Sequence, residues 1–166
     1  MATNIAERAQ QFRRVMGKFA TGVTVITYMR EGDAAGMTAN AFLSVSIEPQ
    51  LILVSARNAS RFCASVAAGD TFSVNFLAEH QEDLSAHFGG RAVAGIDVPI
   101  GYEAGTPYIR DSLAHIVARV VDIHQAGDHK LFIGQAEHLV ENEHANPLLF
   151  YRGKYARMAS AAVARD

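Results

Sequence analysis

Residues 36–46 read Gly36-Met37-Thr38-Ala39-Asn40-Ala41-Phe42-Leu43-Ser44-Val45-Ser46, and Pro49 follows shortly after them. The stretch is too polar for an ordinary core strand and too apolar for a solvated loop. Small residues allow a backbone to approach a ligand closely, while Thr, Ser and Asn supply hydrogen bonds. The stretch therefore suits a chain segment that runs along a bound ligand, and a turn beside a strand is the alternative.

The segments before this stretch predict one helix and one strand. Apolar residues recur at three- and four-residue steps over residues 4–19, which predicts an amphipathic helix that ends by Gly22. Residues 23–28 are β-branched and aromatic, as in a strand. Glu31-Gly32-Asp33 is a turn signal. We expect the opening stretch to begin as a second strand that forms a hairpin with the first.

The segments after it alternate between strands and short helices. Residues 51–55 form a continuous apolar run, which predicts a strand buried on both faces. Asn58 is the expected N-cap of a helix that turns Phe62, Val66 and Cys63 inward. Residues 71–77 alternate as a strand does, and residues 79–88 indicate a second short helix.

The last third predicts a loop followed by hairpins. Residues 89–107 contain glycine and proline without a clear period, so we expect a long irregular loop. Residues 113–124 and 129–140 are two strands joined by a turn at residues 125–128. A further turn at Asn146-Pro147 precedes one or two last strands within residues 148–158.

These elements predict a mainly β fold. Six or seven strands are joined mostly by hairpins, and the βαβ alternation of a Rossmann sheet is absent. A closed antiparallel barrel with peripheral helices is the best interpretation. The 166 residues fit one domain, 1–166, with a core over about 12–158 and a frayed tail at 159–166.

Composition excludes several functional classes. The formal net charge is −2 and no basic block occurs, so nucleic-acid and membrane-surface binding have no electrostatic support. No apolar run is long enough to span a bilayer, and the first residues lack the apolar centre of a signal peptide. Cys63 is the single cysteine, so we expect a reducing, cytoplasmic location.

Familiar site motifs are missing. The sequence has no G-x-G-x-x-G, no Walker A motif and no G-x-S-x-G elbow. Seven histidines invite a metal interpretation, yet neither His80 with His87 nor His138 with His144 has a familiar ligand spacing. We therefore predict no metal site.

Three polar segments remain as candidates for binding. Residues 55–61 run from a strand end into a helix start and carry two arginines, which suits an anion, although an N-capped helix with surface arginines is the plain alternative. Gly127-Asp128-His129 places a histidine at a hairpin tip, either in a cleft or in solvent. Tyr151-Arg152-Gly153-Lys154-Tyr155 is either a polar turn between two strands or a segment whose aromatic and cationic side chains contact the ring and the phosphate of a ligand.

Taken together and in this order, the segments resemble the flavin reductase-like family. The resemblance covers residues 12–158. It is carried by Phe12-Arg13, Phe19-Ala20-Thr21-Gly22-Val23-Thr24-Val25, the opening stretch with Pro49, Phe72-Ser73-Val74-Asn75-Phe76-Leu77, Gly127-Asp128-His129 and Leu148-Leu149-Phe150-Tyr151-Arg152-Gly153. It implies a flavin-binding split barrel that is usually a homodimer.

The resemblance also implies roles for matching positions. The residues expected along the flavin, from its ring to its phosphate, are Met37, Thr38, Ala39, Asn40, Ala41, Ser44, Ser46, Ser55, Ala56, Arg57, Asn58, Ser60 and Arg61. Those expected around NAD(P)H are His129, Tyr151, Arg152, Gly153 and Phe88, with residues 89–107 as a cover. The family often has Ser where this chain has Ala41, so a backbone contact is expected there.

The implied activity is NAD(P)H-dependent reduction of FAD or FMN, with NADH favoured over NADPH. Hydride passes to flavin N5, and reduced flavin then diffuses to a flavin-dependent monooxygenase that acts on an aromatic compound. A pyridoxamine-phosphate-oxidase-like flavoenzyme and a non-catalytic flavin- or haem-binding module are the alternatives. The first would need more basic residues, and the Gly127-Asp128-His129 element argues against the second.

Overall fold

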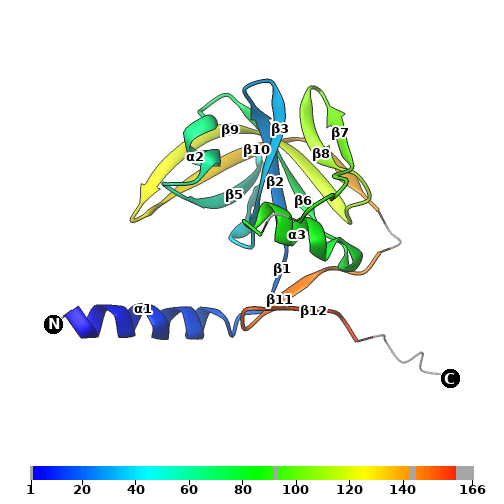
Figure 1. Cartoon of the computed structure of the whole chain (residues 1–166). Coiled ribbons are helices and arrows are strands. Elements are labelled where there is room, and N and C mark those ends of the chain that lie inside the picture. Colours follow the sequence, from blue (N-terminus) through cyan, green and yellow to red (C-terminus); the bar gives the residue numbers. More distant parts are fainter. Residues whose placement is uncertain (1, 92, 143–144, 160–166) are drawn as a thin grey trace.

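The computed structural model describes residues 2–91, 93–142 and 145–159, so the predicted frayed tail lies outside the described residues except for Ala159. Its centre is one seven-stranded antiparallel sheet (Figure 1). In spatial order the strands are β3 (Asp33–Ala39), β2 (Thr24–Arg30), β6 (Thr71–Phe76), β9 (Ala114–Ala126), β10 (His129–Glu141), β5 (Gln50–Arg57) and β4 (Phe42–Ile47).

The two edge strands, β3 and β4, follow each other in the chain. Only Asn40 and Ala41 separate them, so the sheet has to curl until its edges meet. The Ser55 N–H donates to the Ala41 carbonyl at 3.0 Å, which ties the link to β5. The predicted antiparallel barrel with peripheral helices is confirmed, and its seam lies at the opening stretch of the sequence.

Short turns set the register of the hairpins. Glu31 and Gly32 connect β2 to β3 with positive φ angles of 53° and 92°, a turn whose twist matches that of the strands. Gly127, with a φ of 61°, and Asp128 connect β9 to β10. Both hairpins were predicted from these turn residues.

Phe62 fills the interior of the barrel. It lies on α2 (Arg61–Ser65), is fully buried, and packs edge-on against Tyr28, Phe72 and Phe132 with ring centroids 4.7–5.8 Å apart. Val66 and Cys63 lie against the same core, as predicted. A second core, which includes Val25 and Leu84, packs beneath α3 (Glu82–Phe88), which follows the 3₁₀ turn η1 (Glu79–Gln81).

The predicted irregular loop is partly wrong, because residues 100–109 form a hairpin of β7 (Ile100–Glu103) and β8 (Thr106–Ile109). Buried polar groups attach it to the sheet. The Asn75 amide donates to the Val25 carbonyl and to Thr27 Oγ1, and its oxygen accepts from the Ile109 N–H at 2.7 Å. Thr27 Oγ1 in turn donates to the Pro107 carbonyl.

Two further predictions need correction. The first helix, α1 (Ala2–Met16), ends before Gly17, whereas the apolar pattern predicted a helix that continues to about Phe19. The β5 run is not buried on both faces: Ile52, Val54 and Ala56 are buried, whereas Leu51 and Leu53 on the other face are half-buried. In both α1 and β5, the rest of the chain leaves one apolar face of the element partly or wholly uncovered.

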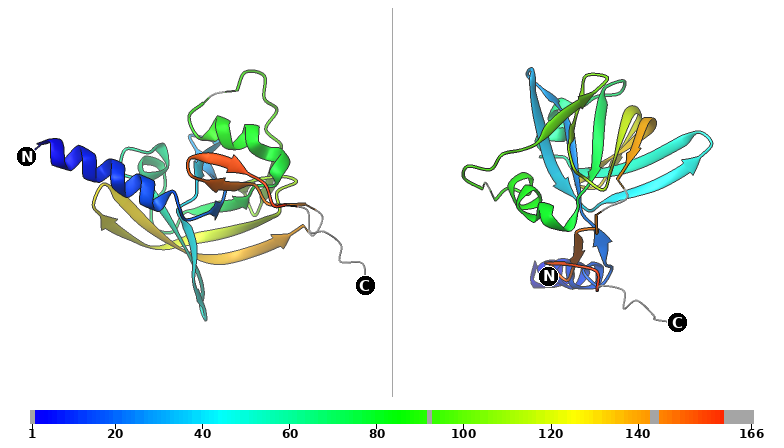
Figure 2. Two further views of the ribbon diagram at one scale, coloured as in Figure 1. Left: turned by 90° about the horizontal axis from the view of Figure 1, so that it is seen from below. Right: turned by 90° about the vertical axis from the view of Figure 1, so that its right-hand side faces the viewer.

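A small sheet of β1 (Thr21–Gly22), β11 (Leu149–Tyr151) and β12 (Lys154–Ala156) lies below the barrel. The Arg152 N–H donates to the Gly17 carbonyl, so the end of α1 adjoins the β11–β12 turn. Figure 2 shows α1 extending away from the barrel. Its apolar residues Ile5, Phe12, Val15 and Met16 are exposed.

His115 on β9 predicts a pH dependence of stability. Its buried ring stacks on Tyr108 with centroids 4.1 Å apart, and its Nε2 has no partner among the described residues. Burial lowers the pKa of His115 from its ordinary 6.5, and the Glu103 carboxylate opposes this. The unfolded chain therefore binds the proton first, so the stabilisation is present above about pH 6.5 and is lost as the pH falls below it.

We expect the urea midpoint of His115→Phe, which keeps the stacked ring, to fall less between about pH 7.5 and pH 5 than the wild-type midpoint. His124→Phe changes an exposed histidine and should keep the wild-type dependence. Equal pH dependence in wild type and His115→Phe would contradict the assignment.

Candidate functional site

The opening stretch of the sequence lines a cleft of about 550 Å³. Four segments meet there: the end of β3 with its link to β4, the end of β5 with the residues after it, the end of α3, and the tip of the β9–β10 hairpin. The lining residues are Met37, Thr38, Ala39, Asn40, Ala41, Ser55, Ala56, Arg57, Ala59, Ser60, Phe88, Gly89 and His129. Residues that are far apart in the chain thus share one site, because the barrel closes at this point.

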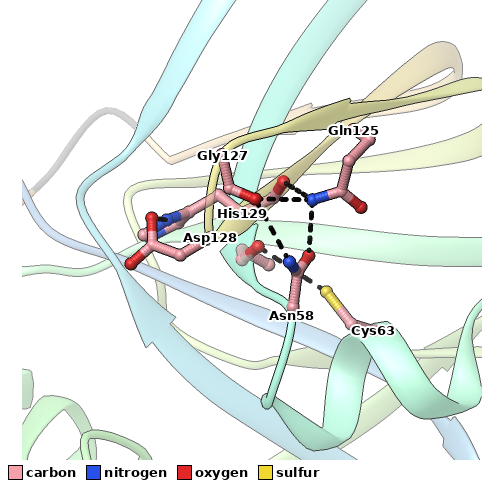
Figure 3. A network of polar contacts seen from close by, with 7 residues as sticks. Asn58, Cys63, Gln125, Gly127, Asp128 and His129 are labelled. Atoms are coloured by element: carbon pink, nitrogen blue, oxygen red, sulfur yellow. Dashed lines mark hydrogen bonds and ion pairs between the residues drawn. The ribbon is translucent and has the colours of Figure 1, made fainter.

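Strand pairing brings His129 beside the β5 end. His129 is opposite Arg57 in the β5–β10 ladder, and the Asn58 N–H donates to the Asp128 carbonyl at 3.0 Å. The Gln125 side chain donates to the carbonyls of Gly127 and His129. Figure 3 shows this network of Asn58, Gln125, Gly127, Asp128 and His129, which holds the hairpin tip against β5.

The His129 ring is oriented by its neighbour. Its Nδ1 lies 2.8 Å from Asp128 Oδ1, and this hydrogen bond lowers the pKa of the Asp128 carboxyl. An ionised Asp128 accepts from Nδ1–H, which leaves Nε2 as the ring nitrogen that a ligand can reach. The side chain is 35% exposed, as suits a residue on a cleft wall.

The backbone wall formed by residues 37–41 carries two different polar groups. Thr38 Oγ1 donates to the Ser85 carbonyl of α3 at 2.6 Å, so its proton is already used in packing and its lone pairs remain. The exposed Asn40 side chain has no hydrogen bond within the described chain and can still bind a ligand.

The predicted helix cap is wrong, and this changes the anion site. Ser60, not Asn58, caps α2, because its hydroxyl accepts from the Cys63 N–H at 3.1 Å. Asn58 serves the hairpin network instead. Since α2 has five residues and its cap is satisfied, the anion-binding capacity of the segment comes from Arg57 and Arg61. Both are exposed, and neither side chain has an ion pair or hydrogen bond within the described residues.

Phe88 closes one side of the cleft. Its ring lies against Gly36 so closely that a Cβ built on Gly36 would be 2.7 Å from two ring carbons. Gly36 is therefore required by the packing of Phe88. Phe88 and Gly89 were expected to cover the ligand, and both line the cleft. The sequence analysis missed Ser85, a buried residue of α3 whose carbonyl accepts from Thr38.

Some predicted site residues lie elsewhere. Ser44 and Ser46 are on β4, and Tyr151 and Arg152 contact each other in an exposed cation–π pair. None of these four lines the cleft. Gly153 lines a smaller neighbouring cleft of about 370 Å³ with Tyr155, which shares residues 38–40 and Gly89 with the first.

Metal ligands and membrane-spanning helices are absent from the described residues. There, no group of three His, Cys, Asp or Glu side chains is placed to hold a metal ion. His138 faces Glu103 at 3.7 Å, and His144 lies outside the described residues. Of the helices that the structure describes, none has the length and hydropathy to cross a membrane.

Comparisons with known proteins agree with one another. A family model described as "Flavin reductase like domain" matches residues 16–159. The chain is 40% identical over 149 residues to the reductase subunit HsaB of a flavin-dependent monooxygenase from Rhodococcus jostii (strain RHA1), covering 88% of this chain and 76% of that one. It is 38% identical over 146 residues to an NADH-dependent flavin reductase from Rhodococcus sp, covering 86% and 82%. The structure of flavin reductase PheA2 in its native state is 44% identical, with a TM-score of 0.83 over 90% of this chain and 97% of that one.

Proposed function

The chain belongs to the flavin reductase-like domain family, and from this we propose that it is an NADH:flavin oxidoreductase that reduces FAD or FMN. The observation that carries the proposal is the cleft at the barrel seam, where the backbone of residues 37–41 faces the β5 end and His129. A bound flavin would supply the hydride-accepting ring, so the protein needs no general base.

The cleft fits a flavin phosphate ester. Its volume of about 550 Å³ lies within the range usual for ligand sites, roughly 300–1,000 Å³. The backbone and Asn40 groups of the β3–β4 link suit the polar edge of a ring. Arg57 and the Ser60 segment follow the end of β5, where an unpaired guanidinium suits a phosphate.

We assign three tasks to the residues of the cleft. Residues 37–41 bind and orient the flavin ring through backbone and amide hydrogen bonds. Arg57 neutralises the phosphate. His129, fixed by Asp128, positions the nicotinamide of NADH over the ring through Nε2. These groups hold the flavin and the nicotinamide in a reactive geometry. This positioning is the contribution expected of the protein.

The direct test is to mix purified protein with NADH and either FAD or FMN and to follow the nicotinamide absorbance. NADH consumption that depends on both protein and flavin supports the proposal. An absence of consumption with both flavins would favour a non-catalytic flavin-binding module. Replacing NADH with NADPH is expected to give the slower reaction, in line with the NADH-dependent relatives.

The role of His129 predicts a selective kinetic defect. We expect His129→Ala to raise the KM for NADH about tenfold, equivalent to roughly 1.4 kcal/mol of binding, with the KM for flavin changed less than about twofold. Initial rates at varied NADH and flavin concentrations measure both. His124→Ala removes another exposed histidine, paired with Asp122 at 3.0 Å, and is the matched control. Equal changes in both KM values, or none, would refute this role.

We propose further that the reduced flavin serves a flavin-dependent monooxygenase that acts on an aromatic compound. Relatives named as reductase components of such enzymes support this, among them the reductase component of a 4-hydroxyphenylacetate 3-monooxygenase from Thermus thermophilus, which is 30% identical over 149 residues. Adding this protein, NADH and flavin to a monooxygenase component without its reductase should restore product formation.

The free thiol of Cys63 and the absence of any second cysteine support a cytoplasmic location.

We also propose that the chain forms a homodimer. Apolar side chains that a monomer leaves exposed occur on β4, β9, β10 and α1. They include Leu43, Val45, Ile47, Val121, Leu139, Val140, Phe12, Val15 and Met16. A set of large apolar side chains that are exposed in this way is typical of a protein interface. A second copy would cover these residues and the half-buried face of β5.

Ile47, which is 84% exposed, gives the test of the dimer. We expect Ile47→Glu to convert a dimer to a monomer, because a buried carboxylate without a partner is costly at an interface. Light scattering after size exclusion measures the mass. Tyr102→Glu changes an exposed apolar side chain outside this surface and should leave the mass unchanged. A wild-type monomer, or a dimer that persists in Ile47→Glu, would contradict the β4 interface.

A further inference from the structure

Gln125, an exposed residue near the end of β9, does not line the cleft, yet its side chain is held at the turn that carries His129. Its Nε2 donates to the Gly127 carbonyl at 2.8 Å and to the His129 carbonyl at 3.0 Å. The same nitrogen lies 3.3 Å from Asn58 Oδ1 (Figure 3). Three acceptors around one nitrogen fix a side chain that water would otherwise solvate.

The polarity of this contact follows from its backbone partners. The carbonyls of Gly127 and His129 can only accept hydrogen bonds, so they orient the amide nitrogen of Gln125 toward themselves. Asn58 turns its oxygen to Gln125 and its nitrogen to the Gly127 carbonyl, at 3.4 Å. Only a hydrogen-bond donor fits among these three oxygens, and a carboxylate of the same shape would be repelled by all of them.

Three consecutive carbonyls of the hairpin tip are held in this way. Gln125 binds those of Gly127 and His129, and the Asn58 N–H donates to that of Asp128 at 3.0 Å. The backbone of residues 127–129 determines where the His129 side chain leaves the chain. The Asp128 carboxylate then determines the rotation of the ring.

Asn58 connects the tip to the opposite wall of the cleft. It directly follows Arg57, which lines the cleft and is opposite His129 in the β5–β10 ladder. Asn58 and Gln125 therefore hold the tip against the segment that we assign to the flavin phosphate. A hydride donor reacts only within a narrow range of distance and angle, so a shift of the tip affects the nicotinamide more than the flavin.

A purely structural role for these contacts would appear in the global stability. Gln125, Gly127 and Asp128 are exposed and lie beyond the buried residues of β9 and β10. Neither core cluster includes them. Their loss should therefore loosen the tip and leave the urea midpoint nearly unchanged, which separates a local positioning role from a role in folding.

We propose that Gln125 is a positioning residue for the hydride donor, which acts through the backbone of residues 127–129 to place His129. The inference rests on the proposed flavin reductase activity, because His129 has a nicotinamide to position only in that reaction. Gln125 carries out this task as a hydrogen-bond donor, and Asn58 supplies the fixed point on β5.

Ligand-free protein gives the first test. NMR order parameters of the amides of residues 127–129 should be about 0.85 in the wild type and should fall toward about 0.6 in Gln125→Leu. Gln125→Glu keeps the shape of the side chain but removes both donor hydrogens, so its order parameters should fall further. Order parameters that stay at the wild-type values in both variants would overturn the proposal.

Steady-state kinetics gives the second test. We expect Gln125→Glu to raise the KM for NADH about fivefold and Gln125→Leu about threefold, with the KM for flavin changed less than about twofold in both. Gln10→Glu makes the same change of charge at an exposed position of α1 and should keep the wild-type KM values. Equal changes in the KM for NADH and the KM for flavin would also refute the positioning role.

A double variant separates positioning from the local effect of a new charge. In the His129→Ala background, Gln125→Glu should raise the KM for NADH less than about twofold, because the side chain to be placed is missing. A full rise without His129 would show that the new carboxylate simply repels NADH, and it would overturn the proposal. If wild-type protein oxidises NADH with flavin while the Gln125 variants match it, this inference fails and the proposed activity stands.

Discussion

Replacing Phe62 with alanine is expected to lower the free energy of unfolding by about 3–5 kcal/mol. The ring is fully buried at the centre of the barrel and contacts Tyr28, Phe72 and Phe132. These neighbours belong to strands β2, β6 and β10, whose hydrogen-bonded ladders prevent them from collapsing into the space. The free energy lost with the buried apolar surface of the ring therefore adds to the free energy needed to keep an empty cavity.

The same substitution should impair ligand binding. Phe62 anchors α2, and α2 carries Arg61 next to the Ser60 cap. Urea denaturation near neutral pH measures the stability, and flavin titration of the folded fraction measures the affinity. Tyr102→Ala truncates an exposed ring and should change stability by less than about 0.5 kcal/mol. A loss below about 1 kcal/mol in Phe62→Ala would show that the barrel interior repacks freely.

Replacing Asn75 with alanine is the second large perturbation, with an expected loss of about 2–4 kcal/mol. Its buried amide makes three hydrogen bonds, to Val25, Thr27 and Ile109. Alanine leaves the Ile109 N–H buried without an acceptor, and an orphaned group of this kind costs about 1–3 kcal/mol. The lost bonds to β2 add to that cost.

The loss of stability in Asn75→Ala should affect the β7–β8 hairpin more strongly than the rest of the fold. Ile109 ends β8, so amide exchange in β7 and β8 is expected to accelerate more than exchange in β9 and β10. Denaturation and hydrogen exchange measured on the same samples test both statements. Asn146→Ala is the control, because within the part of the chain that the structure describes its side-chain amide makes only a long 3.4 Å contact with Glu79 at the surface. Uniform acceleration across the sheet would argue against a specific attachment of the hairpin.

The sequence predicted the parts of this fold that local chemistry dictates. Glu31-Gly32 and Gly127-Asp128 marked their hairpins because their backbone conformations favour glycine and short polar residues. The β7–β8 hairpin was missed because Gly101 and Pro107 interrupt its pattern. The Gly101 position is nevertheless required, since a Cβ there would collide with the Tyr108 ring. Such a contact cannot be recognised before the strands are paired.

The candidate site was predictable in composition and less so in geometry. Residues 37–41 and His129, which the resemblance assigns to the flavin and to the nicotinamide, line one cleft. Asn58 looked like a cap, yet Ser60 takes that position because Asn58 is held by a hairpin 69 residues away. Ser44 and Ser46 follow the stretch in sequence but leave the cleft, because the chain crosses the barrel seam at Asn40 and Ala41.

The position of that seam has a consequence for protein synthesis. The cleft needs both the link at residues 40–41 and the tip of the β9–β10 hairpin, and the intervening sheet order is completed only when β10 pairs with β5. A nascent chain whose strands up to β6 have left the ribosome already contains most of the ligand wall, but not its opposite side. Long-range pairing of this kind forms late. In the proposed assignment of this cleft, flavin can therefore stabilise the chain only after β10 has emerged, and it cannot guide the folding of the earlier strands.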